Sequence, residues 1–104
     1  MVHIVDSENE VNDLIAISTC LVVVDVFTTW CGPCKILSPK LDMMEAEFTN
    51  VKFVKVDADR MSSYADDNGV NALPTVILFK NGKEVERVAG LNEKSLRDAI
   101  TKHM

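Results

Sequence analysis

Runs of apolar residues in this chain predict buried strands. Residues 20–27, CLVVVDVF, and residues 51–59, VKFVKVDAD, are dominated by β-branched and other apolar side chains. Runs of this kind are typical of strands covered on both faces, and such sheets usually carry helices from βαβ crossovers. A shorter run, VHIV at residues 2–5, predicts one more strand.

Between these runs the apolar positions change to helical spacing. Residues 33–48 carry one apolar stripe and contain Pro39, where we expect a kink. Cap signals place three more helices. They are a helix that follows Asp6 or Ser7, a helix over residues 61–68 that ends at Asn68-Gly69, and a helix over residues 93–102 that follows Asn92.

The last part of the sheet is predicted as a hairpin. Residues 75–80 and 83–90 flank Asn81-Gly82, a strong sequence signal for a tight turn between antiparallel strands. The whole order is then βαβαβαββα, which predicts an α/β fold with a five-stranded mixed sheet and four helices. We expect one domain over residues 1–104.

Composition and charge narrow the classes of partner. The chain has 104 residues, 47% of them hydrophobic, and 16 acids against 11 bases give a net charge of −5. Without a basic patch, we expect no nucleic-acid or membrane partner. The N-terminus lacks the charged and apolar regions of a secretion signal, so we expect a cytoplasmic protein.

The segment TTWCGPCK, residues 28–35, carries the candidate chemistry. Cys31 and Cys34 are three residues apart where a strand passes into a helix, a spacing that permits a disulfide. A metal site is disfavoured because only one other cysteine and two histidines at the chain ends are present. An inert buried pair remains the alternative, and Cys20 is predicted to be a small buried residue.

The helix start distinguishes the two thiols. An ordinary cysteine is mostly protonated at neutral pH, and only its thiolate is a good nucleophile. We expect N–H groups of the first helical turn to stabilise the thiolate of Cys31, which makes Cys31 the attacking and Cys34 the resolving thiol. Pro33 fits the first turn, and Gly32 is expected to leave the first sulfur open to a partner protein.

Asp25 interrupts the most apolar run of the chain. A carboxylate inside LVVVDVF is costly to ionise, so its pKa should be raised. Acids with perturbed pKa values often serve catalysis, but a structural acid tied to Lys55 of the neighbouring strand is the alternative.

WCGPCK, the aspartate six residues before Cys31, and the later segments VDAD, LPT, KNGK and VAGLNEKSL together resemble the thioredoxin family along nearly the whole chain. The resemblance implies the thioredoxin fold and reversible dithiol–disulfide exchange with other proteins. It implies no bound cofactor, since thioredoxin reductase would recharge the protein with electrons from NADPH. The resemblance also implies peroxiredoxin, ribonucleotide reductase and methionine sulfoxide reductase as partners. It further implies that this protein is a monomer.

The resemblance also implies roles for individual residues. Asp25 would take the proton of Cys34, directly or through water, and Lys55 would tune Asp25. Pro74 would follow a cis peptide bond, and the backbone of Leu73 would pair with an extended substrate. The implied docking surface consists of Trp30, Gly32, Pro33, Leu73, Pro74, Ala89 and Gly90.

Two positions depart from the family pattern, and two other functions compete with disulfide reduction. Thr28 stands where the family commonly has alanine, and Phe27 where many members have a second tryptophan. An oxidase or isomerase of the same fold is disfavoured because such enzymes usually carry histidine between the cysteines. A binding protein with incidental thiols is the second rival. Asp57 and Asp59 are interpreted as a strand end and the cap of the next helix, not as metal ligands.

Overall fold

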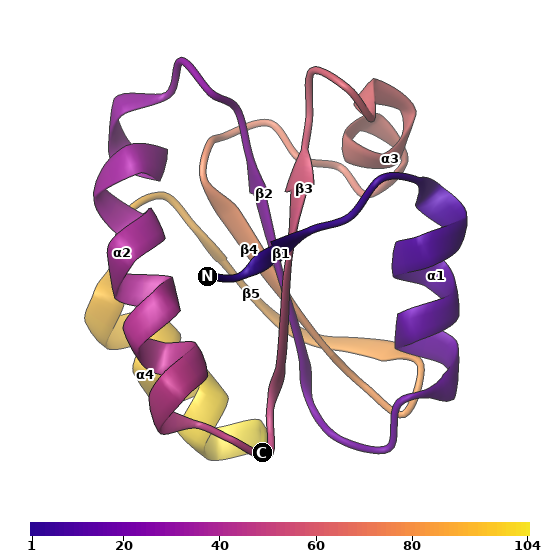
Figure 1. Cartoon of the computed structure of the whole chain (residues 1–104), viewed down its shortest axis with the longest axis vertical. Helices are drawn as coiled ribbons and strands as arrows, with labels where there is room; N and C mark the ends of the chain where they lie inside the picture. The colour runs from indigo at the N-terminus through magenta and orange to yellow at the C-terminus, as the bar shows by residue number, and fades with distance from the viewer.

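The strands of the central sheet lie in the order β1-β3-β2-β4-β5 (Figure 1). The computed structural model describes residues 1–104. Strands β1, β3 and β2 are parallel, whereas β4 is antiparallel to both β2 and β5. This confirms the predicted mixed sheet with four helices. The elements are β1 His3–Ile4, α1 Glu8–Ile17, β2 Val22–Phe27, α2 Gly32–Glu47, β3 Lys52–Asp57, α3 Ser62–Asp67, β4 Thr75–Lys80, β5 Lys83–Ala89 and α4 Glu93–His103.

The helices form one layer on each face of the sheet. In Figure 1, α2 and α4 cover one face and α1 and α3 the other. Successive residues of β2 pack on opposite faces of the sheet. Val23 belongs to the core cluster that contains Leu37 of α2, whereas Val24 belongs to the cluster that contains Val11 of α1. All six residues of β2 are buried, which confirms the central strand that the apolar run predicts.

Local signals in the sequence place most turns and caps correctly. Asn81 and Gly82 have φ angles of 54° and 81°, the left-handed backbone that the predicted hairpin turn requires. Ser7 caps α1 by accepting the N–H of Glu10, and Asn92 caps α4 by accepting the N–H of Ser95. These caps fix where two of the helices begin.

Helix α2 spans Gly32–Glu47 and contains Pro39, within one residue of the prediction at each end. Two details differ from the predictions. Strand β1 contains only His3–Ile4: the N–H of Val2 donates to the carboxylate of Asp42, although the N–H of Val5 still donates to the carbonyl oxygen of Lys55 in β3. A register shift between Leu78 and Phe79 interrupts the β4–β5 pairing. Each helix is too short or too polar to cross a lipid bilayer.

Candidate active site

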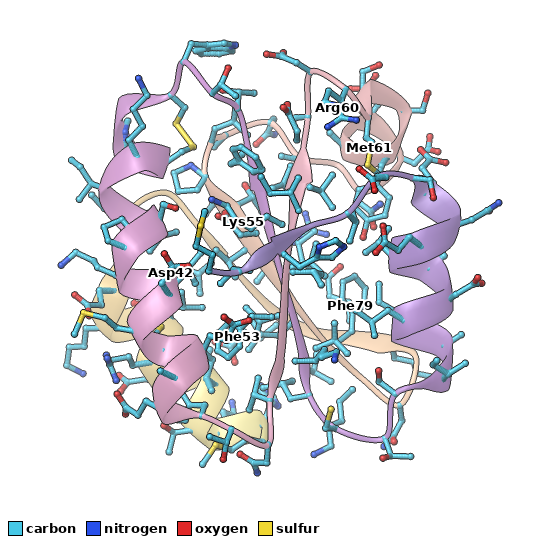
Figure 2. All side chains as sticks on the ribbon, viewed as in Figure 1. Asp42, Phe53, Lys55, Arg60, Met61 and Phe79 are labelled. Carbon is cyan, nitrogen blue, oxygen red and sulfur yellow. A yellow bond between two sulfur atoms is a disulfide. The ribbon has the colours of Figure 1, made fainter.

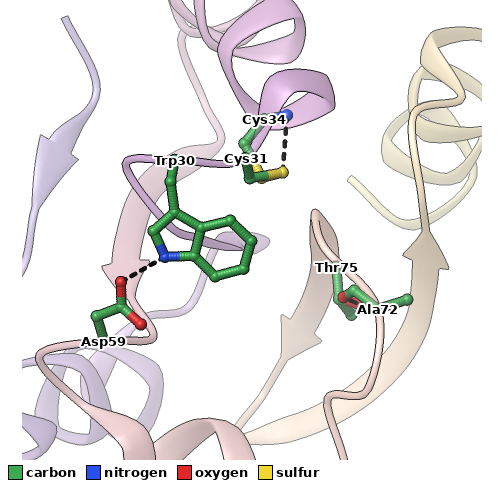
Figure 3. The surroundings of a disulfide bond; sticks show 6 residues. All are labelled: Trp30, Cys31, Cys34, Asp59, Ala72 and Thr75. Carbon is green, nitrogen blue, oxygen red and sulfur yellow. Dashed lines mark hydrogen bonds between the residues drawn. A yellow bond between two sulfur atoms is a disulfide. The ribbon is translucent and has the colours of Figure 1, made fainter.

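The two cysteines of the motif lie where β2 passes into α2, at the carboxyl end of the parallel strands. Cys31 and Cys34 form a disulfide, with their Cα atoms 5.2 Å apart (Figure 3). Ligand sites of open α/β sheets collect at this end of the strands. The structure therefore confirms that the spacing brings the two sulfurs together.

Cys31 is itself the N-cap of α2. The backbone N–H of Cys34 donates to Sγ of Cys31 over 3.2 Å (Figure 3), and the N–H of Lys35 donates to the carbonyl oxygen of Cys31. A sulfur in this position receives an N–H group of the first turn and lies at the positive end of the helix dipole. Both interactions stabilise negative charge on Sγ of Cys31 once the disulfide is reduced.

Both cysteines are less accessible than the sequence suggests. Cys31 is 6% exposed and Cys34 is 4% exposed, because Phe27 and Leu73 pack against the pair. The prediction of an open Cys31 is wrong for the oxidised protein. A Cβ atom placed on Gly32 would nevertheless meet no atom within 4 Å other than its own chain neighbours, so the approach beside the disulfide is free of bulk.

Asp25 is the one buried acid of the sheet that lacks a hydrogen-bond partner. The residue is 1% exposed, and neither carboxyl oxygen has a partner. Burial raises the pKa of Asp25 to about 7, although the charge of Lys55 opposes the shift. The predicted rise in pKa is therefore present, and it arises from lost hydration.

Lys55 lies opposite Asp25 in the β2–β3 register but does not form an ion pair with it. Its Nζ donates to Oγ of Ser38 over 3.0 Å and sits 4.4 Å from the centroid of the Phe27 ring. Figure 2 shows Lys55 on the side of the sheet that faces α2. The alternative of an Asp25 carboxylate fastened to Lys55 is therefore not what the structure contains. The Lys55 side chain is also buried.

A small cavity lies on the Cys34 side of the active-site segment. Its volume is about 220 Å³, and Cys34, Ser38 and Lys55 are among the residues that line it. The cavity gives a route by which water reaches the neighbourhood of Cys34.

The segment that precedes β4 supports the other side of the disulfide. The Leu73–Pro74 peptide bond is cis, as the resemblance implies. Oγ1 of Thr75 donates to the carbonyl oxygen of Ala72 over 2.6 Å, and the N–H of Gly90 donates to the carbonyl oxygen of Pro74 over 2.7 Å. These two bonds hold the segment in place on both sides of the cis bond.

A groove runs between the cysteine motif and this segment. Its volume is about 430 Å³, and it contains four residues of the predicted docking surface: Trp30, Gly32, Pro33 and Leu73. The other three predicted residues do not line it, since Pro74 is buried and Ala89 and Gly90 lie beyond it. The residues that line the groove are Trp30, Cys31, Gly32, Pro33, Asn71, Ala72 and Leu73.

Asn71 and Ala72 line the groove but are not among the residues predicted from the sequence. Their only signal is their position directly before Leu73–Pro74, and neither residue type points to a site by itself.

Trp30 is an exposed ring with one fixed edge. The residue is 68% exposed, and its indole N–H donates to Oδ2 of Asp59 over 2.8 Å (Figure 3). The interpretation of Asp59 as a helix cap is wrong, because α3 begins after Met61 and has no side-chain cap. Asp57 instead accepts the N–H of Asp59, which orients the acid that holds Trp30.

No three His, Cys, Asp or Glu side chains gather closely enough to hold a metal ion. The chemistry that the geometry supports is that of the dithiol–disulfide pair, because Cys31 and Cys34 are bonded and a raised-pKa acid lies in the strand that leads to them.

Comparison with known proteins decides the family. A family model described as thioredoxin matches residues 2–102. The chain belongs to the thioredoxin family. It is similar to thioredoxin from Chlamydia caviae, with 49% identity over 104 residues that cover 99% of each chain.

Solved structures agree with this thioredoxin assignment. The X-ray structure of Fasciola hepatica thioredoxin superposes with a TM-score of 0.95 at 38% identity, covering 99% of this chain and 100% of the other. A chain from a structural study of thiol resolution in yeast mitochondrial 1-Cys peroxiredoxin superposes at 0.91 with 31% identity, covering 97% and 94%. The chain is thus a thioredoxin-type protein-disulfide oxidoreductase with Cys31 and Cys34 as its cysteine pair.

Proposed function

We propose that this thioredoxin reduces disulfides of other proteins through Cys31 as nucleophile and Cys34 as resolving thiol. The observation that carries the assignment of roles is the N–H of Cys34 that donates to Sγ of Cys31 at the start of α2. This contact and the helix dipole favour the thiolate of Cys31, the N-cap residue, whereas Cys34 lies within the first turn.

The exchange balances in two steps. In the first, the Cys31 thiolate attacks one sulfur of the substrate disulfide, a Cys31–substrate disulfide forms, and the second substrate sulfur leaves as a thiolate. In the second, the Cys34 thiolate attacks Sγ of Cys31 and displaces the first substrate sulfur. The substrate gains two electrons and becomes a dithiol, while Cys31 and Cys34 are oxidised to the disulfide.

Asp25 is proposed as the group that removes the proton of Cys34 before the second step. A carboxyl with a pKa of about 7 is present in both protonation states near neutral pH, which suits a group that takes up and releases a proton. The cavity beside Cys34, which Asp25 itself does not line, offers space for a water molecule next to Cys34. Lys55 supports this role by lowering the cost of the Asp25 charge.

The substrate is proposed to dock along the groove as an extended segment. The backbone of Leu73 would pair with it in the manner of an added strand, beside the ring of Trp30. Gly32 and Pro33 form the adjoining wall of the groove. Ala89 and Gly90 are proposed to extend this surface beyond the groove, with the buried Pro74 as part of its support.

The electrons are proposed to come from NADPH through thioredoxin reductase, with no cofactor bound to this chain. A peroxiredoxin is a natural candidate substrate, because a similar chain comes from a study of peroxiredoxin thiol resolution via the glutathione and thioredoxin systems. Ribonucleotide reductase and methionine sulfoxide reductase are further proposed substrates. We propose a monomer that acts in the cytoplasm as one domain.

A coupled assay tests this function. NADPH consumption is followed with thioredoxin reductase, this protein and insulin as disulfide substrate. We expect turnover that Cys31→Ser abolishes and Cys20→Ser leaves unchanged, since Cys20 is a free cysteine outside the motif. Turnover that survives Cys31→Ser would refute the assigned nucleophile. No turnover with the unchanged protein would refute recharging by thioredoxin reductase.

A further inference from the structure

A second cavity lies beside the docking groove, on the α3 side of Trp30. Its volume is about 280 Å³, and it shares Trp30, Asn71, Ala72 and Leu73 with the groove. A substrate segment in the groove would therefore have this cavity next to it. The residues that line it are Thr28, Trp30, Ala58, Asp59, Ser62, Ala65, Asp66, Val70, Asn71, Ala72 and Leu73.

The charged groups of this cavity are all acidic. Asp59 and Asp66 line it, whereas no lysine or arginine does. Asp59 receives the indole N–H of Trp30 on Oδ2, but a carboxylate accepts several hydrogen bonds, so Asp59 retains acceptor capacity. Arg60 is the neighbouring base, and its guanidinium lies 3.9 Å from the carboxylate of Asp6, away from the cavity lining. Figure 2 shows Arg60 beside α3.

Thr28 forms part of the inner wall of the cavity. The residue is 2% exposed, lines the cavity, and its Oγ1 is buried without a hydrogen-bond partner. Unpaired buried hydroxyls are uncommon in folded proteins because their lost hydration is not replaced. Thr28 also lines the cavity on the Cys34 side, so this buried hydroxyl lies in the wall between the two cavities.

Trp30 adds a surface that suits a cation. Its N–H is engaged by Asp59, while the residue stays 68% exposed, so the ring is available to a ligand. Arginine and lysine side chains are attracted to the face of an indole ring. The overall charge of −5 acts in the same direction.

We propose that the cavity between Trp30 and α3 is a subsite for a lysine or arginine side chain that lies near the disulfide of the protein substrate. The inference rests on the proposed disulfide reductase function and adds a substrate preference to it. Asp59 and Asp66 provide the opposite charge, Asn71 provides an oxygen acceptor, and the Trp30 ring covers the aliphatic part of the side chain.

Matched peptides test the subsite. Each peptide contains one disulfide and carries either arginine or uncharged citrulline at one of the three positions on either side of a cysteine. We expect kcat/KM to favour arginine at one or more of these positions by about fivefold at low salt, and less in 1 M NaCl. Equal rates for arginine and citrulline at every position would overturn the subsite while leaving the reductase function intact.

Variants of two neighbouring aspartates distinguish an effect of the subsite from an effect of the protein's overall charge. Asp66→Asn removes a charge that lines the cavity, and Asp67→Asn removes the same charge from the next residue, which does not line it. We expect Asp66→Asn to reduce the arginine preference by about half or more and Asp67→Asn to leave it unchanged. Equal effects of the two asparagine variants would contradict the proposal.

A binding measurement distinguishes failure of the subsite from failure of the function. The oxidised protein is titrated, in NMR experiments, with peptides in which serine replaces both cysteines. We expect the arginine peptide to shift the indole N–H of Trp30 and the amides of Asp66 and Asn71 more than the citrulline peptide does. If no disulfide peptide is reduced, the reductase function fails and these shifts alone decide the subsite. Equal shifts with both peptides would refute it.

Discussion

The two ends of α2 are held in opposite ways. At the carboxyl end, the guanidinium of Arg97 donates to both carboxylate oxygens of Glu47 at 3.0 Å and lies 5.9 Å from the ring centroid of Phe48. The N–H of Phe48 closes the last turn on the carbonyl oxygen of Met44. At the amino end, the cap is the sulfur of Cys31, and no charged side chain is paired with it.

The groups around each end show the same contrast. Hydrogen bonds from Lys40 and Arg97 hold the pKa of Glu93 below its usual value, so these groups stay charged and paired near the surface. Around the amino end, burial raises the pKa of Asp25, and Thr28 has an unpaired hydroxyl. Satisfied contacts thus fasten the helix at one end, whereas unsatisfied and reactive groups are placed at the other.

Among changes at the amino end of α2, removal of the resolving thiol should have the largest effect on turnover. In Cys34→Ser the first step still forms the bond between Cys31 and the substrate, but no second sulfur is present to break it. We expect a stable mixed disulfide, visible by mass spectrometry, and loss of turnover. Cys20→Ser serves as the control, because it removes a cysteine that lies outside the site. Sustained turnover by Cys34→Ser would show that resolution does not need this thiol.

Asp25→Asn should change how stability depends on pH. The pKa of Asp25 rises from 3.8 to about 7 on folding, so the native protein binds more protons than the unfolded chain between these values. Stability relative to Asp25→Asn therefore falls as pH rises through this window, and the loss is complete above about pH 7. The shift corresponds to a difference on the order of 4 kcal/mol.

Urea unfolding of the oxidised proteins from pH 4 to 8.5 measures this difference. We expect the free energy of unfolding of Asp25→Asn, minus that of the unchanged protein, to grow with pH. A difference that stays constant would show that Asp25 titrates alike in the folded and unfolded states.

Asp25→Asn should also slow the second step of the exchange. We expect Cys34 of this variant to resolve the Cys31–substrate disulfide more slowly at neutral pH. An unchanged rate would rule out Asp25 as the proton acceptor.

A change at the carboxyl end of α2 should have the mildest consequence. Arg97→Ala removes the contacts with Glu47 and Glu93, which are exposed and screened by water. We expect the thermal midpoint to fall by about 2 °C, with the alkylation rates of the active-site thiols unchanged. Calorimetry and timed alkylation measure the two quantities. A large loss of thiol reactivity would show that the two ends are coupled.

Local sequence signals account for most of the fold and for the centre of the site. The Cys31–Cys34 spacing, the Asn81-Gly82 turn and the buried run around Asp25 each depend on neighbouring residues, so they can be read directly. The cis bond before Pro74 follows only from the resemblance to the thioredoxin family, because an X-Pro bond alone is rarely cis.

Long-range contacts account for the features that the sequence does not reveal. Trp30 and Asp59 are 29 residues apart and meet only when β2 and β3 are paired, so no local pattern links them. The hydrogen bond from Lys55 to Ser38 of α2, in place of an ion pair with Asp25, likewise depends on tertiary packing and has no local sequence signal. The burial of Cys31 depends on Leu73, which reaches the motif from the segment before β4.

The start of α2 should make Cys31, and not Cys34, the reactive thiol, and limited alkylation examines this difference without any substrate. The reduced protein is treated with less than one equivalent of iodoacetamide at pH 7, and the label is located by peptide mass mapping. We predict that Cys31 is alkylated well before Cys34 and Cys20. Equal labelling of Cys31 and Cys34, or faster labelling of Cys34, would be incompatible with the assigned roles.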